Sequence, residues 1–437
     1  MVARPFGSNV APKQEIINGE PSKDAADEEK RLSDKFAAHR HLVPLVAQNS
    51  EVIFLNAASA PPSNLIVHEA ITRYSAEALY DPYPYTKWRE VRESARGLLA
   101  RCINAESPSC IAFTRDTTEG LGSFIRSVRF RRGDNVVLID TEHPNQAYGW
   151  LVLRAAGLEV RQVPTLADAK RTGRIDAITA DTLRPYVDAR TRAIGISSIT
   201  FDSGQRNDVA GICAEFRGRG IHVLADITQH VGFAPVDVQA LGISAAAFSL
   251  HKGLNAPTGL GALYVSPTAF AELGDPIPPI VSMQGVRDMG EDLVAGDGPV
   301  NMYPDARRFE HANMSLVAVA AAEAFTRFYL DVLGPADVEA HLYNLTGLLT
   351  EECRRLGIRI LGPRERNDRA PHICVLDLDS DEWATYLRGS GGARVTVNRL
   401  GVRVSFGFYN SVDDVRRFVR VLQLGLARGL QSQSYET

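Results

Sequence analysis

The chain has 437 residues, of which 45% are hydrophobic and 23% charged, and its formal net charge is −4. This composition is that of a globular protein long enough for one large domain and a smaller one. The slight excess of acidic residues argues against a nucleic-acid surface, and no apolar run approaches the ~20 residues of a membrane-spanning helix. We therefore expect no nucleic-acid or membrane partner. The five cysteines are scattered and form no C-x-x-C pair, which favours reduced thiols and a cytoplasmic protein.

The first part of the chain is expected to be mostly helical. Residues 1–30 are polar and acidic without an apolar stretch, which predicts a flexible arm rather than a targeting segment. Helical periodicity begins near Leu32, and "VIFLN" (52–56) predicts a short strand. Two amphipathic helices follow at 64–80 and 87–103, because "DPYPY" breaks the helical pattern between them.

From Cys110 the pattern changes to short apolar runs that alternate with helical stretches. This alternation predicts an α/β fold with a mostly parallel central sheet and helices on both faces. The predicted strands are "CIAFT", "NVVLID", "EVRQVP", "AIGISSIT", "HVLADI", "AAAFSL" and "GALYVS".

The C-terminal part predicts a second, smaller unit. A long helix at 314–333 precedes two strands, "HICVLDL" and "VRVSFGF", and a closing helix at 411–428. We therefore expect a flexible arm over 1–30, a large domain with an N-terminal helical segment over 31–313, and a small α+β domain over 314–437.

Polar side chains follow several predicted strands, where open α/β sheets place their binding sites. Asp226 follows "HVLA" and Lys252 follows "AAAFSLH", one strand–loop–strand interval later. His143 follows "NVVLIDTE", and Thr117 and Thr118 follow "CIAFTRD" at the start of a predicted helix. Pyridoxal phosphate needs a lysine for its aldehyde, a carboxylate for its ring nitrogen and donors around its phosphate. A helix N-terminus supplies such donors.

Two segments strengthen this interpretation. "VLADITQHVGF" (223–233) and "FSLHKGLNAPTGLG" (248–261) resemble the class V aminotransferase family of fold-type I pyridoxal phosphate enzymes, and the resemblance extends over most of the chain from about residue 50. That family includes cysteine desulfurases, kynureninases and isopenicillin N epimerases. Within it, "SSITFDSGQR" is similar to the epimerase-like branch, including loline-type fungal alkaloid enzymes.

The resemblance implies roles for individual residues. Lys252 is implied to be the Schiff-base lysine, Asp226 the partner of the pyridine nitrogen, and His143 the residue stacked on the ring. Gln229 is implied to contact the phenolic oxygen of pyridoxal 5'-phosphate. Residues implied to surround the phosphate are Thr117, Thr118, Ser249 and His251.

The resemblance also implies substrate contacts and a homodimer. Arg403 in "VRVSFGFYNS" is implied to bind the substrate carboxylate, for which a planar bidentate donor fits. Asn56 and Ala57 in "FLNAASAPP" are implied substrate contacts. Asn313 in "RRFEHANMS" lies where family members present a loop to the phosphate of the partner subunit.

Simpler interpretations exist for four of these positions. Asp226 in "DITQ" is compatible with a helix N-cap, and Thr117 and Thr118 are compatible with caps of the helix that follows them. Arg403 has two arginines near it in the sequence, and a surface salt bridge is a common fate for such a residue.

The cofactor alone does not define the reaction. Cysteine desulfurases carry a nucleophilic cysteine before the carboxylate-binding arginine, whereas the corresponding loop, "LRGSGGARVTVNRLG" (387–401), contains none. Cys374 lies in an apolar strand pattern, which predicts an inert core thiol, so we do not expect a cysteine desulfurase.

The resemblance implies chemistry on an amino acid through an external aldimine and a Cα carbanion. We favour a lyase, substitution, cyclisation or epimerisation reaction in specialised metabolism. The alternatives are an aminotransferase with a pyridoxamine phosphate intermediate and a non-catalytic binding protein that kept the fold.

Overall fold

The computed structural model describes residues 23–166, 174–275, 285–287, 299–363, 365–378 and 380–431. Its centre is a seven-stranded sheet with the strand order β2-β8-β7-β6-β5-β3-β4. The run from β4 to β7 is parallel, and β8 is antiparallel to both of its neighbours. This confirms the expected mostly parallel sheet. Its strands are β2 (Ile111–Thr114), β3 (Asn135–Ile139), β4 (Glu159–Val163), β5 (Thr191–Ser197), β6 (His222–Asp226), β7 (Ala245–Ser249) and β8 (Gly261–Val265).

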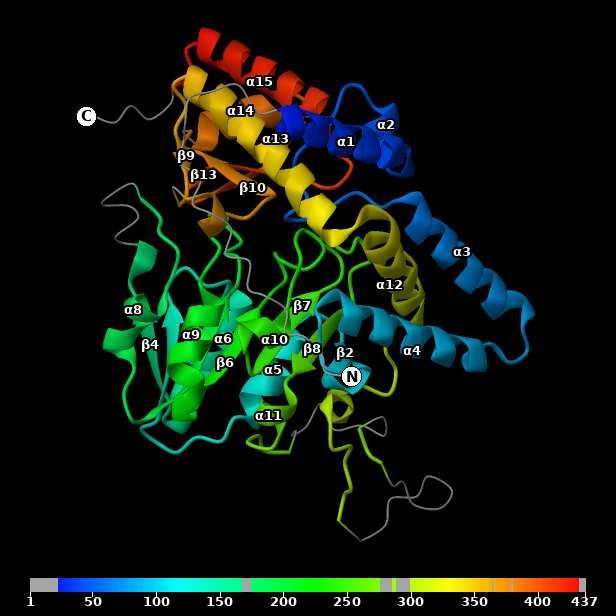
Figure 1. The fold of residues 1–437 in the computed structure, drawn as a ribbon, viewed down its shortest axis with the longest axis vertical. Helices are drawn as coiled ribbons and strands as arrows, with labels where there is room; N and C mark the ends of the chain where they lie inside the picture. The colour runs from blue at the N-terminus through cyan, green and yellow to red at the C-terminus, as the bar shows by residue number, and fades with distance from the viewer. Residues whose placement is uncertain are drawn as a thin grey trace.

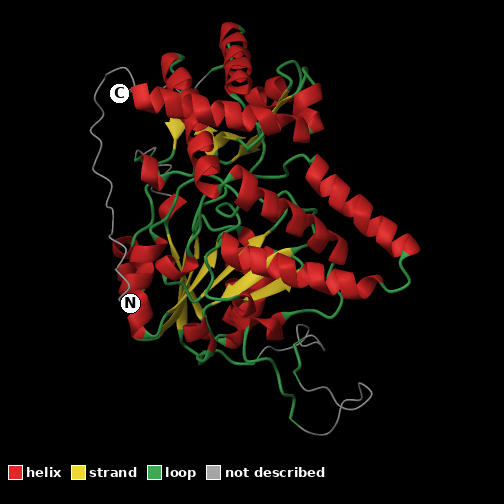
Figure 2. Ribbon diagram, turned by 45° about the vertical axis from the view of Figure 1, so that its right-hand side comes forward, coloured by secondary structure: helices red, strands yellow, loops and turns green. Residues whose placement is uncertain are grey.

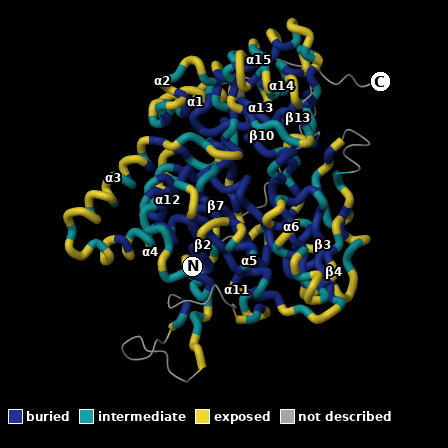
Figure 3. The backbone as a smooth tube through the Cα atoms, turned by 180° about the vertical axis from the view of Figure 1, so that it is seen from behind, coloured by how far each residue is buried: buried dark blue, intermediate teal, exposed yellow. Residues whose placement is uncertain are grey.

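The central sheet is buried on both faces, as its uninterrupted apolar strands predict. In β3, Val137 and Ile139 belong to one hydrophobic cluster, whereas Val136 and Leu138 belong to another. Successive side chains of a strand point to opposite faces, so the two clusters cover the two faces. Figure 2 shows the strands enclosed by helices, and Figure 3 shows the same strands as the most buried part of the chain. The helices in this part are α5 (Thr117–Ser127), α6 (Pro144–Leu151), α8 (Ala180–Leu183), α9 (Val209–Phe216), α10 (Val238–Leu241) and α11 (Pro267–Phe270).

Small residues bring α5 close to the sheet. A Cβ atom added to Gly120 would lie 3.0 Å from Cβ of Ala247 in β7. The glycine and the alanine-rich strand therefore permit a close approach of helix to sheet. As a result, the first turn of α5 lies beside the end of β7.

A smaller antiparallel sheet forms the core of the C-terminal part, with the strand order β12-β13-β10-β9. Its strands are β9 (Ile360–Leu361), β10 (Ile373–Leu376), β12 (Thr396–Asn398) and β13 (Gly401–Ser405). Figure 1 shows this sheet beside three helices, α13 (Pro335–Arg355), α14 (Ser380–Arg388) and α15 (Val412–Ala427). This agrees with the α+β pattern expected after residue 314.

The N-terminal segment lies on this C-terminal part (Figure 1). Its elements are α1 (Lys23–His39), α2 (Pro44–Gln48) and β1 (Ile53–Phe54), and β1 pairs with β11 (Ala393–Arg394). Lys35 forms an ion pair of 2.7 Å with Asp337, and Arg40 one of 2.6 Å with Asp414. The helix α1 begins inside the stretch 1–30 that was expected to be a flexible arm, and residues 1–22 lie outside the described residues. The expected boundaries assigned 31–56 to the large domain, although this segment packs on the small one.

Three helices that pack together lie between the part with the central sheet and the C-terminal part. α3 (Leu65–Tyr80) and α4 (Pro84–Cys102) are separated at "DPYPY", as expected, and α12 (Leu316–Phe328) packs against both. Among the described residues, no helix combines the length and apolar character that crossing a membrane requires.

Candidate active site

A cavity of about 270 Å³ lies at the carboxyl ends of β5, β6 and β7, whose last residues, Ser197, Asp226 and Ser249, line it. This is the place that the topology of an open α/β sheet favours. The sequence-predicted residues that line the same cavity are Thr117, Thr118, His143, Asp226, Gln229, Ser249, His251 and Lys252.

Two glycines determine how the lysine loop and the aspartate loop fit together. A Cβ atom added to Gly232 would lie 2.3 Å from the carbonyl carbon of Gly253, and one added to Gly253 would lie 2.3 Å from Val231 O. Gly232 also has a φ of +83°, a backbone conformation that residues other than glycine rarely adopt. The loops after β6 and β7 therefore pack backbone against backbone, and this contact explains the glycine directly after Lys252.

The environment of Lys252 makes its amine unusually easy to deprotonate. The pKa of Lys252 is lowered to about 8, chiefly by burial and with a smaller contribution from Arg403, while Asp226 opposes the shift. An amine with a lowered pKa is a better nucleophile and base near neutral pH. The position and the charge of Lys252 therefore suit reaction with a carbonyl group.

Asp226 holds its loop rather than capping a helix. It is 7% exposed, and its Oδ1 accepts a hydrogen bond of 2.9 Å from the backbone N–H of Thr228. The residues after it form turns, so the N-cap interpretation is wrong. Among the described residues no group donates a hydrogen bond to its other oxygen, Oδ2, so this oxygen can accept one from a ligand.

His143 lies in one wall of the cavity, and its ring is neutral. It is the N-cap of α6, and its Nδ1 accepts a hydrogen bond of 3.2 Å from the backbone N–H of Asn145. Burial lowers the pKa of His143, Lys252 lowers it further, and Asp226 opposes the shift. The ring meets Phe201 edge-on, with ring centroids 4.8 Å apart.

The threonines at the start of α5 are not its caps. Asp116 caps the helix, since its side chain accepts a hydrogen bond of 2.8 Å from the N–H of Glu119. Thr117 Oγ1 lies 2.9 Å from Thr228 Oγ1 instead, so the capping interpretation is wrong. Ser249 Oγ is buried and has no hydrogen-bond partner among the described residues, although it belongs to a residue that lines the cavity.

Arg403 lies in β13 and is buried rather than part of a surface salt bridge. It is 4% exposed, its Nη1 donates to Phe201 O, and its Nη2 donates to Thr396 Oγ1 over 3.3 Å. Its Nε has no partner among the described residues. Burial lowers the pKa of Arg403 to about 10, opposed by Asp202. The ion pair nearby belongs to Arg399, whose Nε lies 2.8 Å from Asp202 Oδ2.

Asn56 is connected to Arg403 through one hydroxyl group. Thr396 Oγ1, which accepts from Arg403, donates to Asn56 Oδ1 over 2.7 Å. Ala57 is 1% exposed and lies in the hydrophobic core. Neither residue lines the cavity, so their roles as substrate contacts stay predictions.

Asn313 also lies outside the residues that line the cavity. Its neighbour His311 has Nε2 2.6 Å from Glu119 Oε1, which places this segment beside the first turn of α5. The segment is therefore near the N-terminus of α5, and a contact with a partner's phosphate stays a prediction.

The structure adds Glu142, which the sequence analysis missed. It is 5% exposed, and its two oxygens accept hydrogen bonds from Ser197, one of 2.7 Å from N–H and one of 2.5 Å from Oγ. Ser197 is paired with Asp226 in the β5–β6 register. Glu142 therefore joins the loop that carries His143 to the strand beside Asp226. In the sequence Glu142 cannot be distinguished from the other polar residues of its loop. Only the structure shows that it is buried.

Glu142→Gln should flatten the pH dependence of stability of the apoprotein. The pKa of Glu142 is raised to about 8, chiefly by burial and with a smaller contribution from Asp226, while the hydrogen bonds from Ser197 oppose the shift. The folded state therefore keeps a proton that the unfolded state releases near pH ~4.3. The free energy of unfolding therefore falls as the pH rises from ~4.3 toward the pKa of Glu142 in the folded state. The slope is at most about 1.4 kcal/mol per pH unit. Urea unfolding at several pH values should show this slope in the wild type and in an exposed control, Glu90→Gln, but not in Glu142→Gln. An unchanged slope in Glu142→Gln would contradict this ionisation.

The residues around the cavity fit pyridoxal 5'-phosphate. Lys252 would hold its aldehyde carbon and Asp226 its ring nitrogen, and the unpartnered Ser249 Oγ and the start of α5 supply donors for a phosphate. This donor set matches the chemistry that the cofactor requires.

Comparison with known proteins agrees with this geometry. The family model described as "Aminotransferase class-V" matches residues 52–418. An uncharacterized protein of Schizosaccharomyces pombe is 45% identical over 90% of this chain and 88% of its own length. An uncharacterized aminotransferase of the same yeast is 42% identical over 90% of this chain and 96% of its own length.

Solved structures share the fold. A cysteine desulfurase from Thermococcus onnurineus NA1 superposes with a TM-score of 0.75 at 21% identity, covering 90% of this chain and 98% of that one. The family model and the yeast relatives cover the segment that carries every residue of the cavity. The chain therefore belongs to the class V aminotransferase family of pyridoxal 5'-phosphate-dependent enzymes.

Proposed function

We propose that this enzyme acts at the Cα atom of an amino acid by lyase, substitution, cyclisation or epimerisation chemistry. The observation that carries the proposal is a half-buried lysine whose pKa is lowered to about 8, in one cavity with Asp226. Bound pyridoxal 5'-phosphate supplies an electron sink for the electron pair left at Cα.

In this proposal the chain's own residues divide the work. Lys252 removes or returns the proton at Cα, because its amine is held near its pKa at neutral pH. Asp226 holds the protonated ring nitrogen through a charge-assisted hydrogen bond. Arg403 binds the substrate carboxylate through its guanidinium, whose Nε is free of protein partners among the described residues. His143 lines the side of the cavity on which the cofactor's ring would lie.

The thiols support a reaction other than persulfide formation. All five cysteines are buried. Burial raises the pKa of Cys374 to about 11 and those of Cys102 and Cys213 to about 12. A thiol with a raised pKa is a poor nucleophile. Within the described residues, none of the five cysteines lines the cavity.

The second candidate is an aminotransferase, favoured by the 42% identical relative that bears this description. It would need an amino-group acceptor and would leave the cofactor in the amino form between half-reactions. A non-catalytic binding protein is disfavoured, because burying an amine without a use for it costs stability.

We also propose a homodimer in which Asn313 contacts the phosphate of the cofactor bound in the partner subunit. The segment that carries Asn313 lies beside α5 and is partly exposed, and closed twofold pairing is the commonest arrangement of soluble homo-oligomers. Sedimentation of the purified chain would overturn this if a fully active monomer were found.

Incubation with a panel of amino acids in D₂O should identify the substrate class. Amino acids that are bound productively should exchange the Cα proton for deuterium, which proton NMR measures, and the visible absorbance should change with the same compounds. Accumulation of a 2-oxo acid with loss of visible absorbance would favour the aminotransferase. Absence of exchange and of product with every amino acid would refute both candidates.

A further inference from the structure

Gln229 lines the cavity, and both ends of its amide have protein partners. Its Nε2 donates to Ala58 O over 2.8 Å, and its Oε1 lies 3.2 Å from Nε2 of His372. Gln229 is 3% exposed and His372 is 0% exposed. A buried pair of this kind has one consistent arrangement of protons.

The carbonyl of Ala58 fixes that arrangement. A backbone carbonyl only accepts hydrogen bonds, so the nitrogen of the Gln229 amide must face it and the oxygen must face His372. His372 Nε2 must then carry the proton and donate it. His372 Nδ1 has no partner among the described residues, and burial lowers the pKa of His372 well below its ordinary value, with Arg403 and His230 adding to the shift. The ring is neutral and has one N–H, which points at Gln229.

One hydrogen of the Gln229 amide remains after these bonds. The amide nitrogen has two N–H groups, of which Ala58 takes one, and its oxygen is engaged by His372. We propose that His372 is a positioning residue that makes Gln229 a hydrogen-bond donor toward the cavity, matched to an acceptor oxygen of the bound cofactor. This rests on the proposed function, because it requires the cofactor to lie in this cavity.

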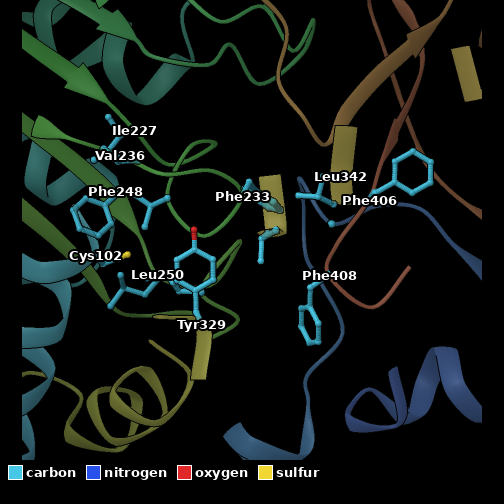
Figure 4. Close-up of a cluster of buried hydrophobic side chains, with 14 of the residues drawn as sticks. Cys102, Ile227, Phe233, Val236, Phe248, Leu250, Tyr329, Leu342, Phe406 and Phe408 are labelled. Carbon is cyan, nitrogen blue, oxygen red and sulfur yellow. The ribbon is translucent and has the colours of Figure 1, made fainter. Parts of the chain in front are cut away.

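Packing holds His372 in this orientation. Its ring stacks on Phe233 with centroids 3.7 Å apart and an angle of 4° between the planes. Figure 4 shows Phe233, Leu342 and Phe406 among the side chains of one buried apolar cluster. The carbonyl of His372 accepts from Phe406 N–H over 2.9 Å. His372 of the small domain therefore fixes the orientation of the Gln229 amide, which lines the cavity of the large domain.

A double-mutant cycle tests this coupling. His372→Leu, Gln229→Ala and the double variant are titrated with pyridoxal 5'-phosphate, and the pH midpoint of the visible absorbance is measured for each. Each single variant should weaken binding about three- to tenfold, the value of one hydrogen bond. Each should also move the pH midpoint upward, because a donated hydrogen bond favours the deprotonated acceptor. The double variant should match Gln229→Ala.

His341 offers a matched control. It is also buried, stacks on Phe36 at 4.1 Å, and has Nε2 3.0 Å from Asn410 O. His341→Leu should lower the melting temperature of the apoprotein as His372→Leu does, but leave cofactor affinity and the pH midpoint unchanged. Additive effects in the double variant, or equal behaviour of His372→Leu and His341→Leu, would overturn the role of His372 alone. A wild-type protein that binds no cofactor would overturn the proposed function as well.

Discussion

Lys252→Ala should abolish turnover and remove the visible absorbance of the lysine-bound cofactor together. The amine of Lys252 lies in the cavity with Asp226, and its lowered pKa of about 8 suits both attachment of an aldehyde and proton transfer. Loss of the proton-transferring group should slow turnover by on the order of 10³-fold or more. Absorbance spectra of the variant and the wild type, with steady-state rates, measure both effects.

Two controls separate this chemistry from folding. Lys87 is exposed and pairs with Asp81 at 2.7 Å, so Lys87→Ala should keep the spectrum and the rate. Lys252→Arg keeps a cation in the cavity but stays protonated, and it should fail as Lys252→Ala does. Full activity in Lys252→Ala would refute the assignment of Lys252, whatever the stability of the variant.

Where local signals sufficed, the sequence predicted which residues share one cavity. Apolar runs located the strands of the central sheet, and the polar residues after them, from Thr117 to Lys252, line the same cavity. In these cases each signal is local, because the polar residues directly follow the apolar run that forms the strand.

The remaining features depend on contacts between distant segments. β1 pairs with β11, and α1 is held by the ion pair of Lys35 with Asp337, so the polar composition of residues 1–30 did not reveal the helix. Arg403 meets Phe201 and His372 meets Gln229 across the two parts of the chain. No periodicity or spacing encodes such pairs, because packing alone brings them together.

The same separation explains why two residues that line the cavity, Phe201 and Gln229, have hydrogen-bond partners in the other part of the chain. Lys252, Asp226 and His143 come from the large sheet, whereas Arg403 and His372 come from the small one. A change in how the two parts pack would therefore alter the position of Arg403 and the orientation of Gln229 together, without moving the lysine relative to the aspartate.

Asp226→Asn should leave the cofactor bound but slow turnover by on the order of a thousandfold, or about 4 kcal/mol. The carboxylate is buried at the end of β6, and Oδ1 is already held by Thr228 N–H. An amide of the same shape keeps the loop but loses the charge that keeps the ring nitrogen protonated. Deuterium exchange at Cα should fall in parallel with turnover, because both need the same electron sink.

Asp134→Asn is the matched control for this substitution. Asp134 is 5% exposed and pairs with Arg192 at 2.8 Å, just before the start of β3 and therefore at the opposite edge of the sheet from the cavity. Losing this pair should lower the melting temperature while leaving exchange and turnover near the wild-type rates. If Asp226→Asn retained turnover within tenfold of the wild type, another group would have to hold the ring nitrogen. If Asp134→Asn lost turnover equally, the loss in Asp226→Asn would reflect stability rather than the charge at the ring.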